Sequence, residues 1–374
     1  KYDYLDGREK AFIKRVSEGT VERRIQIDYV LEQFSTVPVR KMKPLIRELL
    51  RMSVYQILFM ENIPDAAVCN EAVKLAGKRK FQQLRGYVNG VLRAVARDRE
   101  KLVYPDRETS FREYMAVGYA MPAELVGHFC DAYGEEQCEK ILQSFLQRKA
   151  VSIRLREMPE EGRQEELLER WRQSGAKVVR HPYLPYAVEV EKAEGIRNLA
   201  GYGEGIFTVQ DVSSMLVAEA AGIRPGDVVL DVCAAPGGKA VHAAECLVGR
   251  GIVQARDVSE KKAAYIRENA DRMGLSNLEV RVWDATMRDP AMTGTADVLL
   301  ADLPCSGLGV IGRKADIKYR VSPESLKEVV ALQRKILETV WEYVKPGGIL
   351  VYSTCTINRE ENERMAEWSS GMFP

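Results

Sequence analysis

The sequence predicts three successive parts of different fold class: an all-α domain, a small α+β insert, and an α/β domain built on a mostly parallel sheet. Three observations predict this order. Helical apolar patterns fill the first hundred residues, short alternating segments follow them, and apolar strand candidates then alternate with helical patterns. A chain of 374 residues is also too long for one ordinary domain.

The first part is predicted to be helical because its apolar residues recur with helical spacing. In residues 84–95 they fall at i, i+3, i+4, i+7, i+8 and i+11, the stripe of an amphipathic helix. Residues 45–60 are more apolar and predict a largely buried helix. Prolines at 38, 44 and 64 separate the helices, since proline lacks the amide that a continuing helix needs. We place the end of this domain near residue 105.

The second and third parts are predicted from strand patterns. Residues 107–150 continue as helix, and residues 151–155 and 186–190 then alternate like strands around a charged helix at 162–174. Helical patterns recur at 259–273 and 324–344. Apolar strand candidates of the third part lie at 228–232, 252–256, 278–283, 297–301 and 348–353. This alternation predicts an open parallel sheet covered by helices, whose ligands bind beyond the carboxyl ends of the strands.

Composition limits the classes of protein that this chain can be. Hydrophobic residues make up 46% and charged residues 29%, which excludes a disordered chain. No apolar run approaches the ~20 residues that span a bilayer, and no signal peptide opens the chain, so we expect neither a membrane protein nor a secreted one. Seven cysteines without a CxxC pair, and only three histidines, predict no disulfide framework and no metal site, and favour a reducing cytoplasm.

The net charge of +1 hides an asymmetry along the chain. Residues 1–100 hold 20 Lys and Arg against 13 Asp and Glu. Such a segment can bind nucleic-acid phosphates, although a solvated, salt-bridged helical surface explains the charges equally well. The basic residues cluster at Lys14-Arg15, Arg23-Arg24, Arg40-Lys41-Met42-Lys43 and Lys78-Arg79-Lys80, with Arg93, Arg97 and Arg99 nearby.

Small residues and acids follow the first three strands of the third part. A glycine turn of this kind lets a cofactor approach the backbone, and the next helix adds its N-terminal amides, although such turns are also common packing geometry. Asp257 ends the second strand, where an acid can accept bonds from ribose hydroxyls, and Asp284 ends the third, where a carboxylate can meet an adenine edge. A lone Asp at a strand end is most often a helix cap. Together with Asp231 they favour an adenosyl cofactor, because acids repel phosphates. The turn itself reads Cys233-Ala234-Ala235-Pro236-Gly237-Gly238-Lys239.

The last two strands are each followed by a cysteine, Cys305 and Cys355. A thiol is a strong nucleophile once it is ionised, and residues 357–363 predict a capped helix start whose dipole would favour the thiolate of Cys355. A thiolate that adds to carbon 6 of cytosine makes carbon 5 able to attack the methyl group of S-adenosylmethionine, while a carboxyl beside the ring stabilises the charge. The remaining cysteines are interpreted as buried small hydrophobes, at Cys69, Cys130, Cys138 and Cys246.

The carboxyl half resembles the RNA 5-methylcytosine methyltransferases, known by paired Pro-Cys and Thr-Cys motifs. The resemblance implies a Rossmann-like domain that binds S-adenosylmethionine, with Cys355 as the nucleophile and Cys305 assisting product release. It also implies that Asp302 and Lys239 contact the target base, while residues 233–239, Asp257, Asp284 and Asp302 hold the cofactor. One departure is Leu303, where alanine is usual. The matching stretches are DVCAAPGGKA, ARDVS, VWDAT, DLPCSGLGVIGRKADIKYR and YSTCTINREENE.

The amino-terminal part resembles the NusB family of small helical RNA-binding proteins, through LRMSVYQILFMENIPDAAVCNEAVKLAGK at 50–78 and GYVNGVLRAVARD at 86–98. Both halves together resemble the bacterial 16S ribosomal RNA cytosine methyltransferases of the Sun/Fmu (RsmB) type, which implies cytosine 967 of 16S ribosomal RNA as the target. We therefore expect a cytoplasmic, monomeric RNA-binding enzyme with no DNA or membrane partner. A methyltransferase of transfer RNA, or a non-catalytic ribosome assembly factor, stays open as an alternative.

The resemblance also divides the chain. It implies a NusB-like domain at 1–105, linker helices with a small RNA-binding subdomain at 106–205, and the methyltransferase domain at 206–374. The first helix of the NusB family normally precedes this start, and the methyltransferase fold normally continues past the Thr-Cys motif into closing strands. We therefore expect the outer domains to be incomplete, which would leave an exposed sheet edge after the final residue, Pro374.

Overall fold

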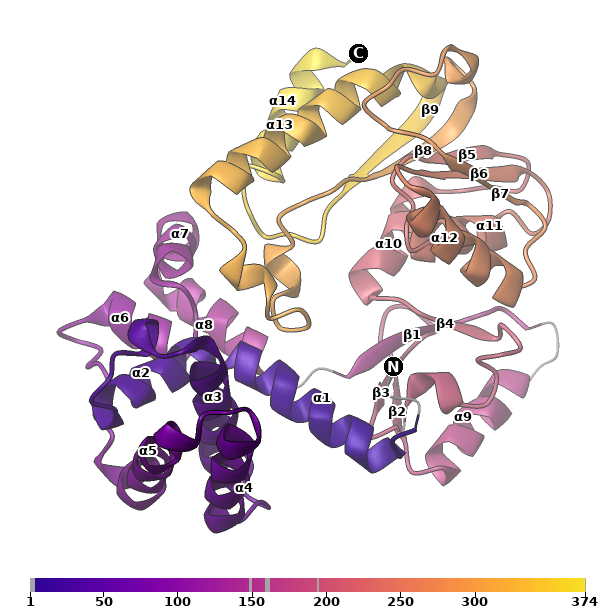
Figure 1. Cartoon of the computed structure of the whole chain (residues 1–374). Helices are drawn as coiled ribbons and strands as arrows, with labels where there is room; N and C mark the ends of the chain where they lie inside the picture. Colours follow the sequence, from indigo (N-terminus) through magenta and orange to yellow (C-terminus); the bar gives the residue numbers. More distant parts are fainter. Residues whose placement is uncertain (1–3, 148–149, 159–161, 194, 374) are drawn as a thin grey trace. The chain divides into compact units, whose positions relative to one another are not determined.

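The computed structural model describes residues 4–147, 150–158, 162–193 and 195–373 and forms two compact units (Figure 1). The first contains the chain up to residue 147 together with residues 310–321. The second contains residues 148–309 and 322–374. The predicted boundaries at 105 and 205 do not coincide with this division, and they stay predictions of domain limits within the units.

The first unit is helical around one apolar core. Val88, Val91, Leu92 and Val95 of the predicted amphipathic stripe are buried in that core, which confirms the face that the spacing indicates. The predicted buried helix at 45–60 forms as well. The helices are α1 (Gly7–Glu22), α2 (Arg24–Phe34), α3 (Pro44–Phe59), α4 (Asp65–Lys78), α5 (Arg85–Asp98), α6 (Phe111–Gly118), α7 (Ala123–Tyr133) and α8 (Glu135–Leu146).

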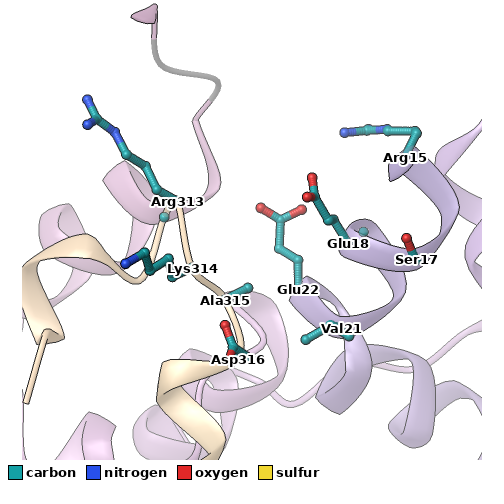
Figure 2. Close-up of a pocket in the computed structure, with 11 residues that line it drawn as sticks. Arg15, Ser17, Glu18, Val21, Glu22, Arg313, Lys314, Ala315 and Asp316 are labelled. Carbon is teal, nitrogen blue, oxygen red and sulfur yellow. The ribbon is translucent and has the colours of Figure 1, made fainter. Parts of the chain in front are cut away.

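Residues 310–321 come from the carboxyl half of the chain yet pack in the helical unit, against the end of α1. Lys318 Nζ donates a hydrogen bond of 2.7 Å to the carbonyl of Glu22, and the Tyr319 hydroxyl donates one of 2.8 Å to the carbonyl of Val21. These bonds satisfy carbonyls that the end of a helix leaves unpaired. Residues of α1 and residues 312–316 line a cavity of about 480 Å³. Figure 2 shows that both elements contribute acidic and basic side chains to this lining.

The second unit begins with a small antiparallel sheet in the order β2-β3-β1-β4. Its apolar core contains the Trp171 and Phe207 rings, which are in edge contact at 4.9 Å between centroids. The predicted α+β insert is therefore present. Its elements are β1 (Val151–Leu155), α9 (Arg163–Gln173), β2 (Lys177–Arg180), β3 (Ala187–Glu191) and β4 (Phe207–Val209).

The larger sheet of this unit is parallel, in the order β7-β6-β5-β8-β9. The chain moves outward from β5 in one direction and then returns to β8 on its other side, so the strand order reverses between β5 and β8. Open sheets bind their ligands at such a point. The strands are β5 (Val228–Asp231), β6 (Ile252–Asp257), β7 (Leu278–Val282), β8 (Ala296–Asp302) and β9 (Val344–Ser353), close to the predicted ranges.

Helices cover both faces of this sheet, as Figure 1 shows. On one face Val217, Ala240 and Ile266 pack against the strands, and on the other Ile336 and Met365 do so. Burial on both faces explains why the strands read as apolar runs rather than alternating ones. The helices are α10 (Val212–Ala221), α11 (Gly238–Cys246), α12 (Glu260–Arg272), α13 (Pro323–Val340) and α14 (Glu363–Met372).

In the described part of the chain, no helix is both long and apolar enough to cross a membrane.

Candidate active site

The parallel strands carry the predicted site residues to one edge of the sheet. Asp231, Asp257 and Asp302 are the last residues of β5, β6 and β8, and β9 ends at Ser353, two residues before Cys355. Carboxyl ends of parallel strands share an edge, so residues far apart in the sequence meet there.

The glycine turn between β5 and α11 is held by backbone bonds at both ends. The amide of Ala234 donates to the carbonyl of Arg256 at 2.8 Å, and that of Gly237 donates to the carbonyl of Ala234 at 2.7 Å. Gly237 has a φ of +105°, and a Cβ there would lie 3.2 Å from the Cα of Ile266. Only glycine fits this conformation without strain, and it opens the N-terminus of α11 toward the strand ends.

The two acids predicted to face an adenosyl group have different surroundings. Asp257 is 4% exposed, and its carboxylate accepts the amides of Ala235 (3.0 Å) and Val258 (2.7 Å) and pairs with Lys262 at 3.0 Å. It therefore orders the glycine turn itself. Asp284 is exposed two residues beyond β7, and hydrogen bonds from the amide and hydroxyl of Thr286 lower the pKa of its carboxyl.

Asp231 is fully buried at the end of β5. Its Oδ1 is 3.4 Å from the amide of Cys233, and no hydrogen-bond partner of its Oδ2 lies among the described residues. Burial, followed by the negative charge of Asp302, raises the pKa of Asp231 to about 7. Burial and the Asp231 charge also raise the pKa of Cys233 to about 12, so that thiol stays protonated at neutral pH.

Asp302 and Lys239, both predicted to contact the target base, form an ion pair. The Lys239 ammonium lies 2.7 Å from Asp302 Oδ2, and the Ser353 hydroxyl donates to Asp302 Oδ1 at 2.9 Å. The pair joins the start of α11 to the end of β8. About a third of the Asp302 side chain is exposed, so it can still contact a ligand.

The two predicted catalytic cysteines lie together. The sulfurs of Cys305 and Cys355 are 3.2 Å apart, and the amide of Cys355 points to the Cys305 sulfur at 3.4 Å. Cys355 is exposed and Cys305 is half-buried. The hydrogen bond with Cys355, followed by burial, raises the pKa of the Cys305 thiol, so this thiol keeps its proton at neutral pH.

The prediction that a helix starts within residues 357–363 is wrong for most of this range, because residues 357–362 are not helical. Helix α14 begins only at Glu363, and Asn362 caps it without a side-chain hydrogen bond. The Asn362 side chain instead accepts from the Thr354 hydroxyl at 2.6 Å and donates to the carbonyl of Thr356 at 3.0 Å. Because a helix dipole acts only over its first turn, α14 does not supply the field expected at Cys355.

Glu361 lies in the intervening turn and was missed by the sequence analysis. It is 0% exposed, and its carboxylate accepts hydrogen bonds from Ser306, Gln333 and Asn358. The polar run around it gives no signal of burial, because Gln333 of α13 and Ser306 in the loop after β8 are distant in the sequence.

The basic clusters of the first unit differ in whether they pack within the unit or are exposed to solvent. The Arg24 guanidinium lies 3.5 Å above the Tyr319 ring, in a contact inside the unit. Residues 78–80 are exposed at the end of α4. The Lys43 ammonium is 5.7 Å from the centroid of the Phe81 ring, which places Lys43 beside the residue that follows the basic run at 78–80.

Family models match both halves of the chain. The model described as 16S rRNA methyltransferase RsmB/F matches residues 220–368, and the NusB family model matches residues 1–97. The probable ribosomal RNA small subunit methyltransferase B of Bacillus subtilis (strain 168) is 36% identical over 366 residues, covering 98% of this chain and 80% of its own. The chain belongs to the ribosomal RNA small subunit methyltransferase B family.

Other relatives support this family and its fold. The probable small subunit methyltransferase B of Synechocystis sp. (strain ATCC 27184 / PCC 6803 / Kazusa) is 30% identical over 96% of this chain and 80% of its own. The crystal structure of PH0851 has a TM-score of 0.84 at 25% identity, covering 100% of this chain and 83% of its own. A methyltransferase homolog from Pyrococcus horikoshii has a TM-score of 0.60 at 26% identity, over 69% and 81% of the two chains. The predicted fold class, family and methyltransferase activity are confirmed.

The site of this small subunit methyltransferase B family member suits S-adenosylmethionine, the methyl donor on which the family depends. The buried Asp231 Oδ2, which lacks a partner among the described residues, is available to accept a hydrogen bond. A Cβ at Gly237 would lie closer to Ile266 than ordinary van der Waals contact, so the turn favours glycine. Acidic strand ends suit a sulfonium ion and ribose hydroxyls better than they suit phosphates.

Proposed function

We propose that this enzyme methylates carbon 5 of a cytosine in 16S ribosomal RNA through a covalent bond between Cys355 and carbon 6. The observation that carries the proposal is the pair of sulfurs, 3.2 Å apart, on the loops after β8 and β9. The family name indicates 16S ribosomal RNA, and the resemblance indicates cytosine 967. Such an enzyme acts in the cytoplasm.

Bound S-adenosylmethionine supplies the methyl group. We assign its binding to the glycine turn and to acids at three strand ends, where Asp257 and Asp284 accept bonds from ribose hydroxyls and the adenine edge. A carboxylate can accept about four hydrogen bonds, so the carboxylates of Asp257 and Asp284 can still accept hydrogen bonds from a ligand. The assigned residues are Cys233, Ala234, Ala235, Pro236, Gly237, Gly238, Lys239, Asp257, Asp284 and Asp302.

The reaction begins at the exposed thiol. The Cys355 thiol first loses its proton to solvent water, and the thiolate forms a bond to carbon 6 while the electron pair of the ring double bond moves to carbon 5. Carbon 5 then bonds to the methyl carbon, whose bond to the donor sulfur breaks and leaves its electron pair on that sulfur. The proton on carbon 5 passes to solvent water, the bond from carbon 6 to Cys355 breaks, and the ring double bond returns.

Neighbouring groups support the first and last steps. Asp302 accepts a hydrogen bond from the exocyclic amine, and the Lys239 ammonium balances negative charge that develops on the ring. Cys305, whose pKa is raised, keeps its proton and donates a hydrogen bond to the Cys355 sulfur as it leaves. This division of labour makes Cys355 the nucleophile and Cys305 the group that assists release.

The test compares single cysteine variants on 16S ribosomal RNA fragments. Cys355→Ala should abolish methyl transfer while RNA binding persists. Cys305→Ala should slow release and accumulate a covalent protein–RNA adduct, seen as a shifted band on a denaturing gel. Retained turnover in Cys355→Ala refutes the assignment of the nucleophile.

The substrate is tested by mapping the methylated nucleotide after reaction with 16S ribosomal RNA and with transfer RNA. We expect one modified cytosine, in the 16S ribosomal RNA. Modification of transfer RNA alone would contradict the proposed substrate, and RNA binding without methyl transfer would favour an assembly factor instead.

A further inference from the structure

The buried carboxylate of Glu361 lies where the two cysteine-bearing loops meet. Glu361 Oε2 accepts a hydrogen bond of 2.8 Å from the backbone amide of Ser306, the residue after Cys305, and the Ser306 hydroxyl donates to Oε1. The Asn358 side chain, three residues after Cys355, donates to the same Oε1 at 2.9 Å. One carboxylate therefore binds both loops.

Helix α13 supplies the third anchor. The Gln333 side chain is 0% exposed, and its Nε2 donates both to Glu361 Oε2 at 3.0 Å and to the carbonyl of Pro304 at 2.8 Å. Because Pro304 precedes Cys305, the backbone is held on both sides of that cysteine. Gln333 also lies 3.2 Å from the Tyr352 hydroxyl, which donates to the carbonyl of Glu361 at 2.6 Å.

The loop of Cys355 is tied to the same group. The hydroxyls of Ser306 and Thr356 are 2.7 Å apart, and Thr356 follows Cys355 directly. Burial and the charge of Glu361 raise the pKa of Tyr352, so its hydroxyl stays a donor. Removing the carboxylate would leave several buried donors without an acceptor, and the loops would have to shift to satisfy them.

We propose that Glu361 is a positioning residue that holds Cys305 at its working distance from Cys355. The inference rests on the proposed function only for its effect on product release. The spacing of the two sulfurs can be measured without RNA or cofactor. Glutamine matches glutamate in size, but an N–H₂ group replaces one of the two carboxylate oxygens and faces the donors that this oxygen accepted from.

The first experiment measures how fast diamide joins the two cysteines in the full chain. Diamide takes two electrons and two protons from the thiols, a disulfide forms, and the reagent becomes a hydrazine. Peptide mapping by mass spectrometry then follows the Cys305–Cys355 pair. We expect Glu361→Gln to slow its formation about tenfold or more, the effect of losing buried hydrogen bonds to a charged group.

Two further variants make this result decisive. Glu360→Gln is the matched control, because Glu360 is exposed and its carboxylate lies 4.0 Å from Arg364; it should crosslink at the wild-type rate. Ser306→Ala removes only the hydroxyl bonds and should slow crosslinking less than Glu361→Gln does. If Glu361→Gln does not fold, Ser306→Ala still tests the network. Wild-type crosslinking in every folded variant overturns the inference.

The second experiment measures release of the covalent RNA adduct. We expect Glu361→Gln to accumulate adduct. The double variant Glu361→Gln, Cys305→Ala should release adduct no more slowly than Cys305→Ala alone, because both substitutions remove the assistance that Cys305 gives to release. If Cys305→Ala traps adduct but Glu361→Gln releases it at the wild-type rate, only the positioning inference fails. If Cys305→Ala traps none, the proposed role of Cys305 fails, and the crosslinking result alone decides the role of Glu361.

Discussion

Burial of Asp231 predicts that the second unit loses stability as pH rises toward neutral. The carboxyl is fully buried, and burial raises its pKa from 3.8 to about 7. A carboxyl with a higher pKa in the folded state binds its proton more tightly when folded. Its contribution is therefore most favourable at low pH and is lost as pH rises from about 4 to about 7.

The size of the effect follows from the shift. At ~1.4 kcal/mol per pKa unit, the shift of about three units costs about 4 kcal/mol once the carboxyl is ionised in both states. Between pH 5 and pH 8 the loss is about 2 to 3 kcal/mol, because part of it has already occurred by pH 5. Asp231→Asn removes this dependence, although its new amide hydrogens lack an acceptor and cost ~1–3 kcal/mol at every pH.

Tryptophan fluorescence can follow this unit by itself. The chain has four tryptophans, and Trp171, Trp283, Trp341 and Trp368 all lie in the second unit. Urea unfolding of the wild type and of Asp231→Asn at pH 5 and pH 8, without ligand, gives the free energy of unfolding at each pH. The wild type should lose more stability than the variant between the two.

The matched control is Asp271→Asn, because Asp271 is exposed on α12 of the same unit. It should retain the pH dependence of the wild type. Equal pH dependence in the wild type and in Asp231→Asn would refute the reasoning, since Asp231 would then not be the group whose ionisation costs stability.

Three further predictions concern other contacts. Gly309→Ala would place a Cβ 2.8 Å from the carbonyl oxygen of Cys355, so we expect slower methyl transfer in single-turnover assays with little change in RNA affinity. Replacing residues 78–80 with glutamates should weaken RNA binding and reduce the slope of its salt dependence by about one for each lost phosphate contact, measured by titration at several salt concentrations. Lys318→Met leaves the carbonyl of Glu22 unpaired and should destabilise the first unit by ~1–3 kcal/mol, measured by circular dichroism during thermal unfolding.

The parallel sheet could be predicted because its signals are local. The central strands β5 and β8 contain short apolar runs, and residues such as Val229, Leu299 and Leu300 are buried on one face or the other. The site acids and cysteines follow these runs directly, so finding the strands also located Asp257, Asp302 and Cys305. Residues 310–321 gave no comparable signal, because their packing depends on α1, nearly 300 residues away in the chain.

The error after Cys355 has the same origin as the omission of Glu361. A run of Asn, Arg and Glu indicates a capped helix when only neighbouring residues are considered, since the cap needs no distant partner. Here Asn362 binds Thr354 and Thr356, and Glu361 binds Ser306 and Gln333. These contacts hold the turn open, and the helix starts later.

The acids at the strand ends could be predicted from the sequence, whereas Glu361 could not. Each acid that we propose to contact the cofactor follows a strand, and its position relative to that strand is visible in the sequence. An acid that holds two loops together lies in a polar run that reads as surface, and it is buried only because α13 and the loop after β8 close over it. A buried carboxylate is stable only when hydrogen-bond donors surround it, so donors from distant residues such as Gln333 offset the free energy of removing it from water. Burial of a charge in an otherwise polar turn is therefore a structural signal for a positioning role.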